Sequence, residues 1–154
     1  MLAEVLFKFD MADVFSSDVR SRIMASIRGR DTAPELLIRK VVHRLGFRFR
    51  LHRRDLPGTP DIVFPRLHKI IFVHGCFWHM HRGCKRAGLP RTNRTFWKAK
   101  IARNAKRDRT DQHKLRKLGW DVLVVWQCDT KDTTALERRL RKFLYSATSG
   151  ANRK

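Results

Sequence analysis

The chain has 154 residues, of which 35 are Lys or Arg and 14 are Asp or Glu, so its formal net charge is +21 at pH 7. A charge of this size on one domain predicts a polyanionic partner, and nucleic acid is the usual one. A basic tail of the ribosomal kind fits poorly, because the basic residues are spread along the whole chain among apolar ones. No run of about 18 apolar residues occurs, so no membrane span is expected.

The ends of the chain and its cysteines indicate the compartment and the domain boundaries. Residues 1–10 are apolar but too short and wrongly flanked for a secretory signal, and Met11 resembles a second start. Three cysteines, an odd number, argue for reduced thiols in a cytosol and against a disulfide framework. We therefore expect a cytoplasmic protein with a partly flexible arm over 1–16, a single domain over 17–146 and a polar tail over 147–154.

Capping residues and hydrophobic periodicity predict two helices in the first part of the chain. Ser17 can cap a helix over 18–28, in which apolar side chains recur on an imperfect face. Asp31 and Thr32 can cap a second helix with a proline in its first turn, and Gly46 is typical of its end. Both helices precede every predicted strand.

Strands and further helices follow in alternation. Phe47, Phe49 and Leu51 recur at period two, which predicts a strand over 47–52 with these side chains inward. Four successive apolar residues predict a central strand over 69–73 that is covered on both faces. The other predicted elements are a short strand over 61–64, a long basic helix over 92–118, a buried strand over 120–126 and an amphipathic helix over 133–145. Helices flanking a small mixed sheet make this an α/β domain.

The segment from His74 to Cys84 is the most informative in the chain. It reads His-Gly-Cys-Phe-Trp-His-Met-His-Arg-Gly-Cys and holds three histidines, two of the three cysteines and an adjacent aromatic pair, Phe77 and Trp78. A buried core does not need these polar groups, and surface loops rarely carry two bulky aromatic residues side by side. Metal ligands, proton-transfer groups and stacking groups in one segment indicate a catalytic or binding site.

Four side chains match the ligand set of a structural zinc site, namely Cys76, His81, Cys84 and Cys128. Zinc prefers four such ligands in a tetrahedron, and three cysteines with one histidine form a common closed set. Taken alone, Cys128 is more simply a small buried hydrophobic residue. The local group of the other three ligands favours zinc, which we expect to fix the loop that carries the aromatic pair.

Two carboxylates and two further histidines form a candidate hydrolytic site. Asp61 begins a strand and Glu35 lies near the start of a helix, and a carboxylate beside a phosphodiester generally binds a hard cation such as Mg²⁺. His74 and His79 lie outside the zinc set and can transfer protons near neutral pH. Singly, Asp61 is more simply a strand-cap residue and Glu35 a partner of the helix dipole. Only the four residues together favour catalysis.

Six segments along the chain carry a family resemblance. They are the helix with Met24 and Ile27, the run Arg30-Asp-Thr-Ala-Pro-Glu35, the turn Leu56-Pro-Gly-Thr-Pro-Asp61, the run Ile71-Phe-Val-His74-Gly-Cys-Phe-Trp-His79 with His81, the helix with Phe96, Trp97, Asn104, Arg107 and Asp108, and the run Gly119-Trp-Asp-Val-Leu-Val-Val-Trp126 with Cys128. In this order they resemble the very-short-patch mismatch repair endonucleases over residues 12–145. The run from His74 to His79 is the most specific of the six.

The resemblance implies a fold and an activity. The fold would be restriction-endonuclease-like, of the PD-(D/E)xK class, a three-layer α/β domain with a central mixed sheet and a structural zinc site. The activity would be Mg²⁺-dependent nicking of one strand of duplex DNA on the 5′ side of the T of a T:G mismatch. That mismatch arises from deamination of 5-methylcytosine, and the nick would initiate very-short-patch repair.

The resemblance also implies a setting. We expect a monomer in the bacterial cytoplasm, at the nucleoid when it acts, linked to a DNA cytosine methyltransferase and to downstream repair proteins. Two other functions stay open from the residues themselves. One is a nuclease of the same fold that cuts matched DNA at a recognition sequence, and the other is a non-catalytic, zinc-braced DNA-binding module.

The family's catalytic residues fall on matching positions of this chain. By resemblance, Asp61 is a magnesium ligand, and the backbone carbonyl of Val73 is a second one. His79 is the general base that activates water, and His74 lies near the scissile phosphate and the leaving group. Glu35 is a supporting acid. The acid and the lysine of an ordinary nuclease motif of this class are absent, and the run Phe72-Val-His74 occupies their place. This fits the family, in which histidine replaces the lysine.

The family's zinc and DNA-contacting residues are matched as well. The zinc positions fall on Cys76, His81, Cys84 and Cys128, although the loop before Cys84 is one residue longer than in the family. The aromatic residues that enter the base stack beside the mismatch are Phe77, Trp78 and Trp97, and the apolar residues that enter from the opposite groove are Met24 and Ile27. Among the remaining residues, Trp120 and Trp126 are predicted to be core, and Asp108 is predicted to brace its helix.

Overall fold

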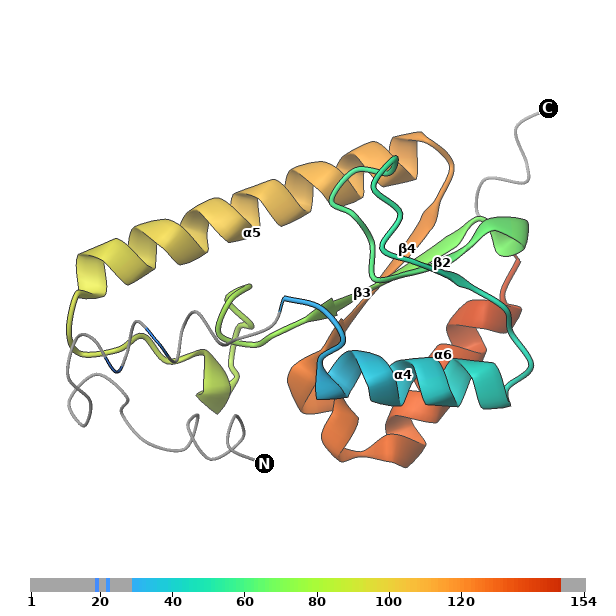
Figure 1. Ribbon diagram of the computed structural model, residues 1–154, viewed down its shortest axis with the longest axis horizontal. Helices are drawn as coiled ribbons and strands as arrows, with labels where there is room; N and C mark the ends of the chain where they lie inside the picture. Colours follow the sequence, from blue (N-terminus) through green and yellow to red (C-terminus); the bar gives the residue numbers. More distant parts are fainter. Residues whose placement is uncertain (1–18, 20–21, 23–28, 148–154) are drawn as a thin grey trace.

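The structure is a computed structural model that describes Val19, Arg22 and residues 29–147 (Figure 1). The predicted arm, most of the helix predicted over 18–28 and the apolar residues Met24 and Ile27 therefore lie outside the described residues. Among the residues that are described, no helix is both long enough and apolar enough to span a membrane.

A mixed sheet of four strands forms the centre of the fold, as predicted. The strands lie in chain order and are β1 (Arg50–Leu51), β2 (Ile62–Phe64), β3 (Lys69–His74) and β4 (Asp121–Trp126). The β1–β2 and β2–β3 pairs are antiparallel, whereas β3 and β4 are parallel. In this register His74 lies opposite Trp126, so the carboxyl ends of β3 and β4 meet at one edge of the sheet.

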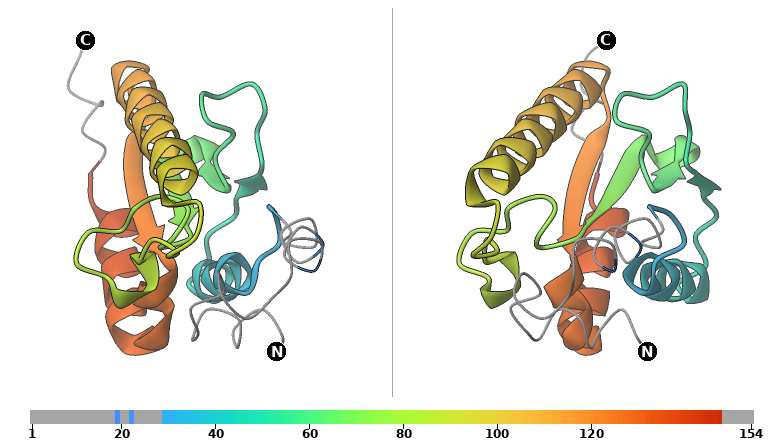
Figure 2. Two further views of the ribbon diagram at one scale, coloured as in Figure 1. Left: turned by 90° about the vertical axis from the view of Figure 1, so that its left-hand side faces the viewer. Right: turned by 60° about the vertical axis from the view of Figure 1, so that its left-hand side comes forward.

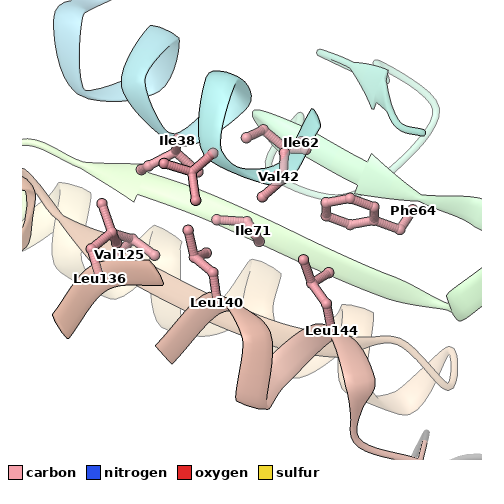
Figure 3. Close-up of a cluster of buried hydrophobic side chains, with 10 residues drawn as sticks. Ile38, Val42, Ile62, Phe64, Ile71, Val125, Leu136, Leu140 and Leu144 are labelled. Atoms are coloured by element: carbon pink, nitrogen blue, oxygen red, sulfur yellow. The ribbon is translucent and has the colours of Figure 1, made fainter. Parts of the chain in front are cut away.

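Helices cover both faces of the sheet and give three layers. Helices α4 (Ala33–Arg44) and α6 (Thr133–Tyr145) lie on one face, and α5 (Arg94–Lys117) crosses the other (Figures 1 and 2). The larger core lies between the sheet and the α4–α6 pair, and Figure 3 shows its side chains pointing toward one another from all three elements. A smaller core, with Leu115 at its centre, joins α5 to the opposite face.

The predicted ends of the helices are confirmed because local chemistry sets them. The Thr32 side chain accepts the Glu35 backbone N–H at the start of α4, and Gly46 takes a φ of 88° just after its end. Asp132 caps α6 in the same way by accepting the Ala135 N–H at 2.9 Å. Such caps satisfy backbone groups that have no partner within the helix.

The strand predicted over 47–52 is wrong in its length and in one of its inward residues. Only Arg50–Leu51 pairs in the sheet, and Leu51 is 40% exposed. The Phe47 backbone N–H donates to the Val42 carbonyl at 3.1 Å, so the chain is still closing α4 at that point. Phe47 and Phe49 nevertheless pack on the core, each with its ring edge against Phe64. The period-two pattern therefore reports burial here without sheet pairing.

Candidate active site

The predicted catalytic and metal-binding residues gather at the carboxyl ends of β3 and β4. His74 is the last residue of β3, and the loop that follows carries the rest of the Cys/His segment before α5 begins (Figure 1). The η3 turn (Gln127–Lys131) continues from β4 at the same edge and brings in Cys128. Because the two strands are parallel, residues 52 positions apart in the sequence, His74 and Trp126, meet at this edge.

The structure brings the four predicted zinc ligands together. One donor atom from each of Cys76, His81, Cys84 and Cys128 lies within 4.8 Å of the other three. The Cys128 Sγ lies 3.3 Å from the Nδ1 of His81, and Cys76 is fully buried. Gly83 takes a φ of 73° in the turn before Cys84.

The donor chemistry of this cluster fits a bound cation. Burial raises the pKa of the Cys76 thiol to about 12, and the neighbouring sulfurs add to that shift. A thiolate at this place therefore needs a positive ion beside it. Three sulfurs and one imidazole at these separations match the closed tetrahedral set that zinc prefers.

His79 and Asp108 form a hydrogen-bonded pair beside His74. The Nδ1 of His79 lies 2.5 Å from the Oδ2 of Asp108 on α5, and because a carboxylate can only accept, the imidazole donates. Burial opposes ionisation of Asp108, but the bond from His79 and the nearby charges of His79 and Arg107 outweigh it, so its pKa lies below the usual value. Asp108 thus fixes the tautomer and orientation of His79.

The two histidine rings are stacked. Their centroids are 3.9 Å apart and their planes 13° apart, and His74 is buried beneath the Trp126 ring edge. Burial, together with the nearby His79, lowers the pKa of His74 to about 4, so that its ring is neutral near pH 7. The ring nitrogens have their lone pairs in nearly parallel planes and cannot converge on one cation without rotation. The arrangement therefore suits proton transfer better than metal binding.

Asp61 lies just before β2, next to the carboxyl end of β3. Its Oδ2 accepts the Val73 backbone N–H at 2.7 Å. Burial raises the pKa of this carboxyl to about 6, the Val73 N–H acts in the opposite direction, and the nearby Glu35 raises it further. A buried carboxylate whose charge is poorly compensated is a suitable ligand for a hard cation. The carboxylate thus fits the predicted role of magnesium ligand.

Glu35 is buried and engaged at the start of α4. Its carboxylate accepts the Asp31 backbone N–H at 3.1 Å, the Thr32 hydroxyl at 2.9 Å and an Arg39 guanidinium N–H at 2.9 Å. These bonds cap the start of α4. A carboxylate in the first turn also interacts favourably with the helix dipole, which is the structural alternative that the sequence left open. Its effect on Asp61 is electrostatic, and its role as a supporting acid stays a prediction.

The predicted DNA-contacting aromatic residues pack on one another. Phe77 and Trp97 are each 8% exposed, and Trp78 lies with its ring edge against both of them. The Nζ of Lys100 lies 5.4–5.7 Å from three ring centroids of this group, including that of the exposed Phe96. The structure therefore gathers three of the five predicted residues, and the other two fall outside the described residues.

Three contacts at this site were not predicted from the sequence. Asp108 was predicted only to brace its helix and Trp126 only to fill the core, and Asn104, which donates to the Trp78 carbonyl at 3.2 Å, received no role. The contacts of Asp108 and Asn104 could have been predicted, because these two residues recur with Trp97 at helical spacing on the packed face of α5. The contact of Trp126 depends on strand register, which the sequence alone does not specify.

Comparison with known proteins adds an independent line of evidence. Residues 12–86 match the family model described as DNA mismatch endonuclease Vsr. The type II nicking enzyme V.XorIIP of Xanthomonas oryzae is 48% identical over 134 residues, which cover 87% of this chain and 98% of that protein. The DNA mismatch endonuclease Vsr of Escherichia coli is 44% identical over 118 residues, which cover 77% of this chain and 75% of that protein. The type II nicking enzyme V.NmeAIP of Neisseria meningitidis is 37% identical over 134 residues, which cover 87% of this chain and 95% of that protein.

Proposed function

Because the chain belongs to the Vsr family of DNA mismatch endonucleases, which are DNA-cleaving hydrolases, we propose that it nicks one strand of duplex DNA on the 5′ side of the T of a T:G mismatch. The observation that carries the proposal is the pair of His79 and Asp108, stacked on His74 at the sheet edge that also holds Asp61. The sheet and its flanking helices suit the fold of PD-(D/E)xK nucleases that the resemblance implies.

Asp61, with the Val73 carbonyl, would hold Mg²⁺ at this edge. When bound there, the cation would polarise the scissile phosphodiester and make an attacking water more acidic. The raised pKa of Asp61 supports this role, since the charge of a bound cation would offset the cost of burying the ionised carboxylate.

His79 would take the proton from the attacking water. Its Nδ1 is bonded to Asp108, which leaves Nε2 as the nitrogen with a free lone pair. Asp108 would then stabilise the imidazolium that forms when His79 accepts the proton. His74 is neutral and held by the stack, so its N–H group can donate to the phosphate or to the departing oxygen.

The Cys/His cluster would hold a structural zinc ion. Its four residues bracket Phe77, Trp78 and His79, so a closed metal site would fix both the aromatic group and the base in one loop. Small domains commonly use such a site to order a segment that lacks regular secondary structure. The segment from residue 75 to residue 93 has no strand and only one turn of 3₁₀ helix, η2 (Lys85–Ala87).

Mismatch recognition would come from aromatic insertion. A T:G wobble pair is easier to unstack than a matched pair, so Phe77, Trp78 and Trp97 would enter the stack there at a lower cost. Met24 and Ile27 would enter from the opposite groove. The net positive charge supplies phosphate contacts, which give affinity without sequence choice.

The proposed setting is the bacterial cytoplasm, where the protein would act as a monomer at the nucleoid. A cytosine methyltransferase would create the base whose deamination gives the mismatch, and repair proteins would act on the nick. One active site per chain is sufficient because only one strand is cut.

Binding and cutting by the Asp61→Asn variant test this assignment. The wild-type protein and the variant are compared on a T:G duplex and its matched T:A twin, with Mg²⁺ or with a chelator. We expect the variant to bind the T:G duplex as the wild-type protein does and to cut neither duplex. Cutting by the variant would refute the metal-ligand role. Equal cutting of both duplexes by the wild-type protein would indicate a restriction-type nuclease, and binding without cutting would indicate a DNA-binding module.

A further inference from the structure

Trp126 contacts both the metal cluster and the catalytic histidines. Its ring stacks face to face on the imidazole of His81, with centroids 4.2 Å apart and planes 4° apart. The same ring forms a T-shaped pair with the imidazole of His74, with centroids 5.4 Å apart and planes 77° apart. A single rigid side chain thus touches one predicted zinc ligand and one predicted catalytic residue.

The backbone holds this side chain in place. Trp126 is the last residue of β4 and pairs in register with His74. Its backbone N–H donates to the Asp129 carboxylate at 2.9 Å, which ties the end of the strand to the turn that carries Cys128. The backbone that carries the indole is therefore fixed relative to both sites.

The tryptophan next to the other end of the same strand differs. Trp120 packs beside the smaller core, and its ring lies 5.0 Å from that of His68, tilted by 35°. His68 follows the η1 turn (Pro65–Leu67) at the opposite end of β3 from His74. Trp120 immediately precedes β4 and Trp126 ends it, and each ring lies beside a histidine, but only Trp126 lies at the candidate active site.

We propose that Trp126 is a positioning residue that couples the Cys/His metal cluster to the orientation of His74. A metal-bound His81 would fix the indole by stacking, and the indole edge would in turn keep the His74 ring parallel to that of His79. Neighbours of this kind orient metal ligands and often matter for both metal affinity and activity. The expected effect on nicking rests on the proposed function, whereas the expected effect on metal retention does not depend on it.

Trp126→Leu, Trp126→Phe and the matched control Trp120→Leu test this coupling. Four quantities are measured on zinc-loaded protein. They are the single-turnover nicking rate, the dissociation constant for T:G duplex, the rate of zinc transfer to a coloured chelator, and the width of the His74 ring signal in ¹H–¹³C spectra. We expect Trp126→Leu to lower nicking and to speed zinc loss by about 10-fold to 100-fold each. DNA affinity should stay within about twofold, because the side chain is not placed against DNA.

The conservative variant and the control decide between positioning and general destabilisation. Trp126→Phe keeps an aromatic ring and should recover part of both losses. Trp120→Leu should lower the melting temperature without changing zinc loss, nicking or the His74 signal. Trp126→Leu should broaden or shift that signal through ring motion, and if it fails to fold, Trp126→Phe supplies the comparison.

Two outcomes would overturn the proposal. One is unchanged zinc loss in both Trp126 variants, which would separate the indole from the metal cluster. The other is an equal effect of Trp120→Leu on zinc loss and on His74. If the wild-type protein does not nick T:G duplex, the proposed function fails, and zinc loss and the His74 signal still decide the coupling.

Discussion

His79 in the loop after β3 donates a hydrogen bond to Asp108 on α5 at 2.5 Å, although 29 residues separate them in the chain. The bond joins two segments that carry different parts of the site, since the loop holds three residues of the Cys/His cluster and α5 holds Trp97 and Lys100. A carboxylate that holds one imidazole nitrogen favours proton acceptance at the other. The consequences can be measured.

Asp108→Asn should lower the nicking rate by about 100-fold or more while leaving DNA affinity unchanged. An amide can bond to His79 without stabilising the imidazolium that forms in the reaction, so the loss should fall on the chemical step. Single-turnover nicking and equilibrium binding on one T:G duplex measure the two effects. Asp111→Asn, on the same helix, is the matched control and should retain the wild-type rate. Similar rates for Asp108→Asn and the wild-type protein would show that His79 needs no carboxylate partner.

Asp61→Asn should stabilise the protein at pH 8 when no divalent cation is present. The folded-state pKa of about 6 lies above the ordinary value of 3.8, so the folded state binds more protons between these values, and stability falls as pH rises through that window. The penalty is fully present above pH 6 and is absent below about pH 4. Asparagine removes the charge and keeps an acceptor for the Val73 N–H. Urea unfolding should show a gain of about 1–3 kcal/mol at pH 8 that shrinks toward pH 4. A gain that does not change with pH would show that the buried charge is not its cause.

Cys128→Ser should reduce bound zinc and destabilise the loop that carries the aromatic group. The wild-type protein is expected to retain about one zinc ion per chain, because four ligands make one closed site. Elemental analysis after dialysis measures the metal, and thermal unfolding measures the destabilisation. His113→Ala changes an exposed histidine of α5 and should behave as the wild-type protein does. A folded wild-type protein that nicks DNA but contains no zinc would contradict the assignment.

Trp78→Ala should reduce the preference for mismatched over matched duplex by about 10-fold, since stacking of one base on an aromatic ring contributes about 1–3 kcal/mol. Trp78 separates recognition from folding better than Phe77 does, because Phe77 is 8% exposed and its loss would open a cavity. Tyr145→Ala removes an aromatic side chain that is 65% exposed on α6 and serves as the control. An unchanged preference in Trp78→Ala would remove Trp78 from the recognition model.

Sequence reasoning succeeded where local chemistry decides the structure. The helix that begins after Thr32 and ends before Gly46 follows from its caps, and the last helix follows from its strongly amphipathic pattern. The clustering of Cys128 with Cys76 followed from their places at the ends of two buried strands. In each case the determining residues lie close together in sequence or on neighbouring strands.

Sequence reasoning failed where the outcome depends on distant backbone. The strand predicted over 47–52 is short because the N–H of Phe47 bonds back to α4, which alternation of apolar residues does not reveal. The role of Asp108 depends on how α5 crosses the sheet edge, and that of Trp126 depends on parallel pairing with β3. A pattern of buried residues cannot separate a core tryptophan from one that contacts a metal ligand.

Strand-resolved nicking of a single T:G duplex tests the central claim most directly. The two strands carry different labels, Mg²⁺ is present, several flanking sequences are compared, and the T:A twin of each duplex serves as the control. We predict one nick, on the 5′ side of the mismatched T, with the G strand and every T:A twin left intact. Equal cutting of a T:G duplex and its T:A twin, or cutting of both strands, would contradict the claim.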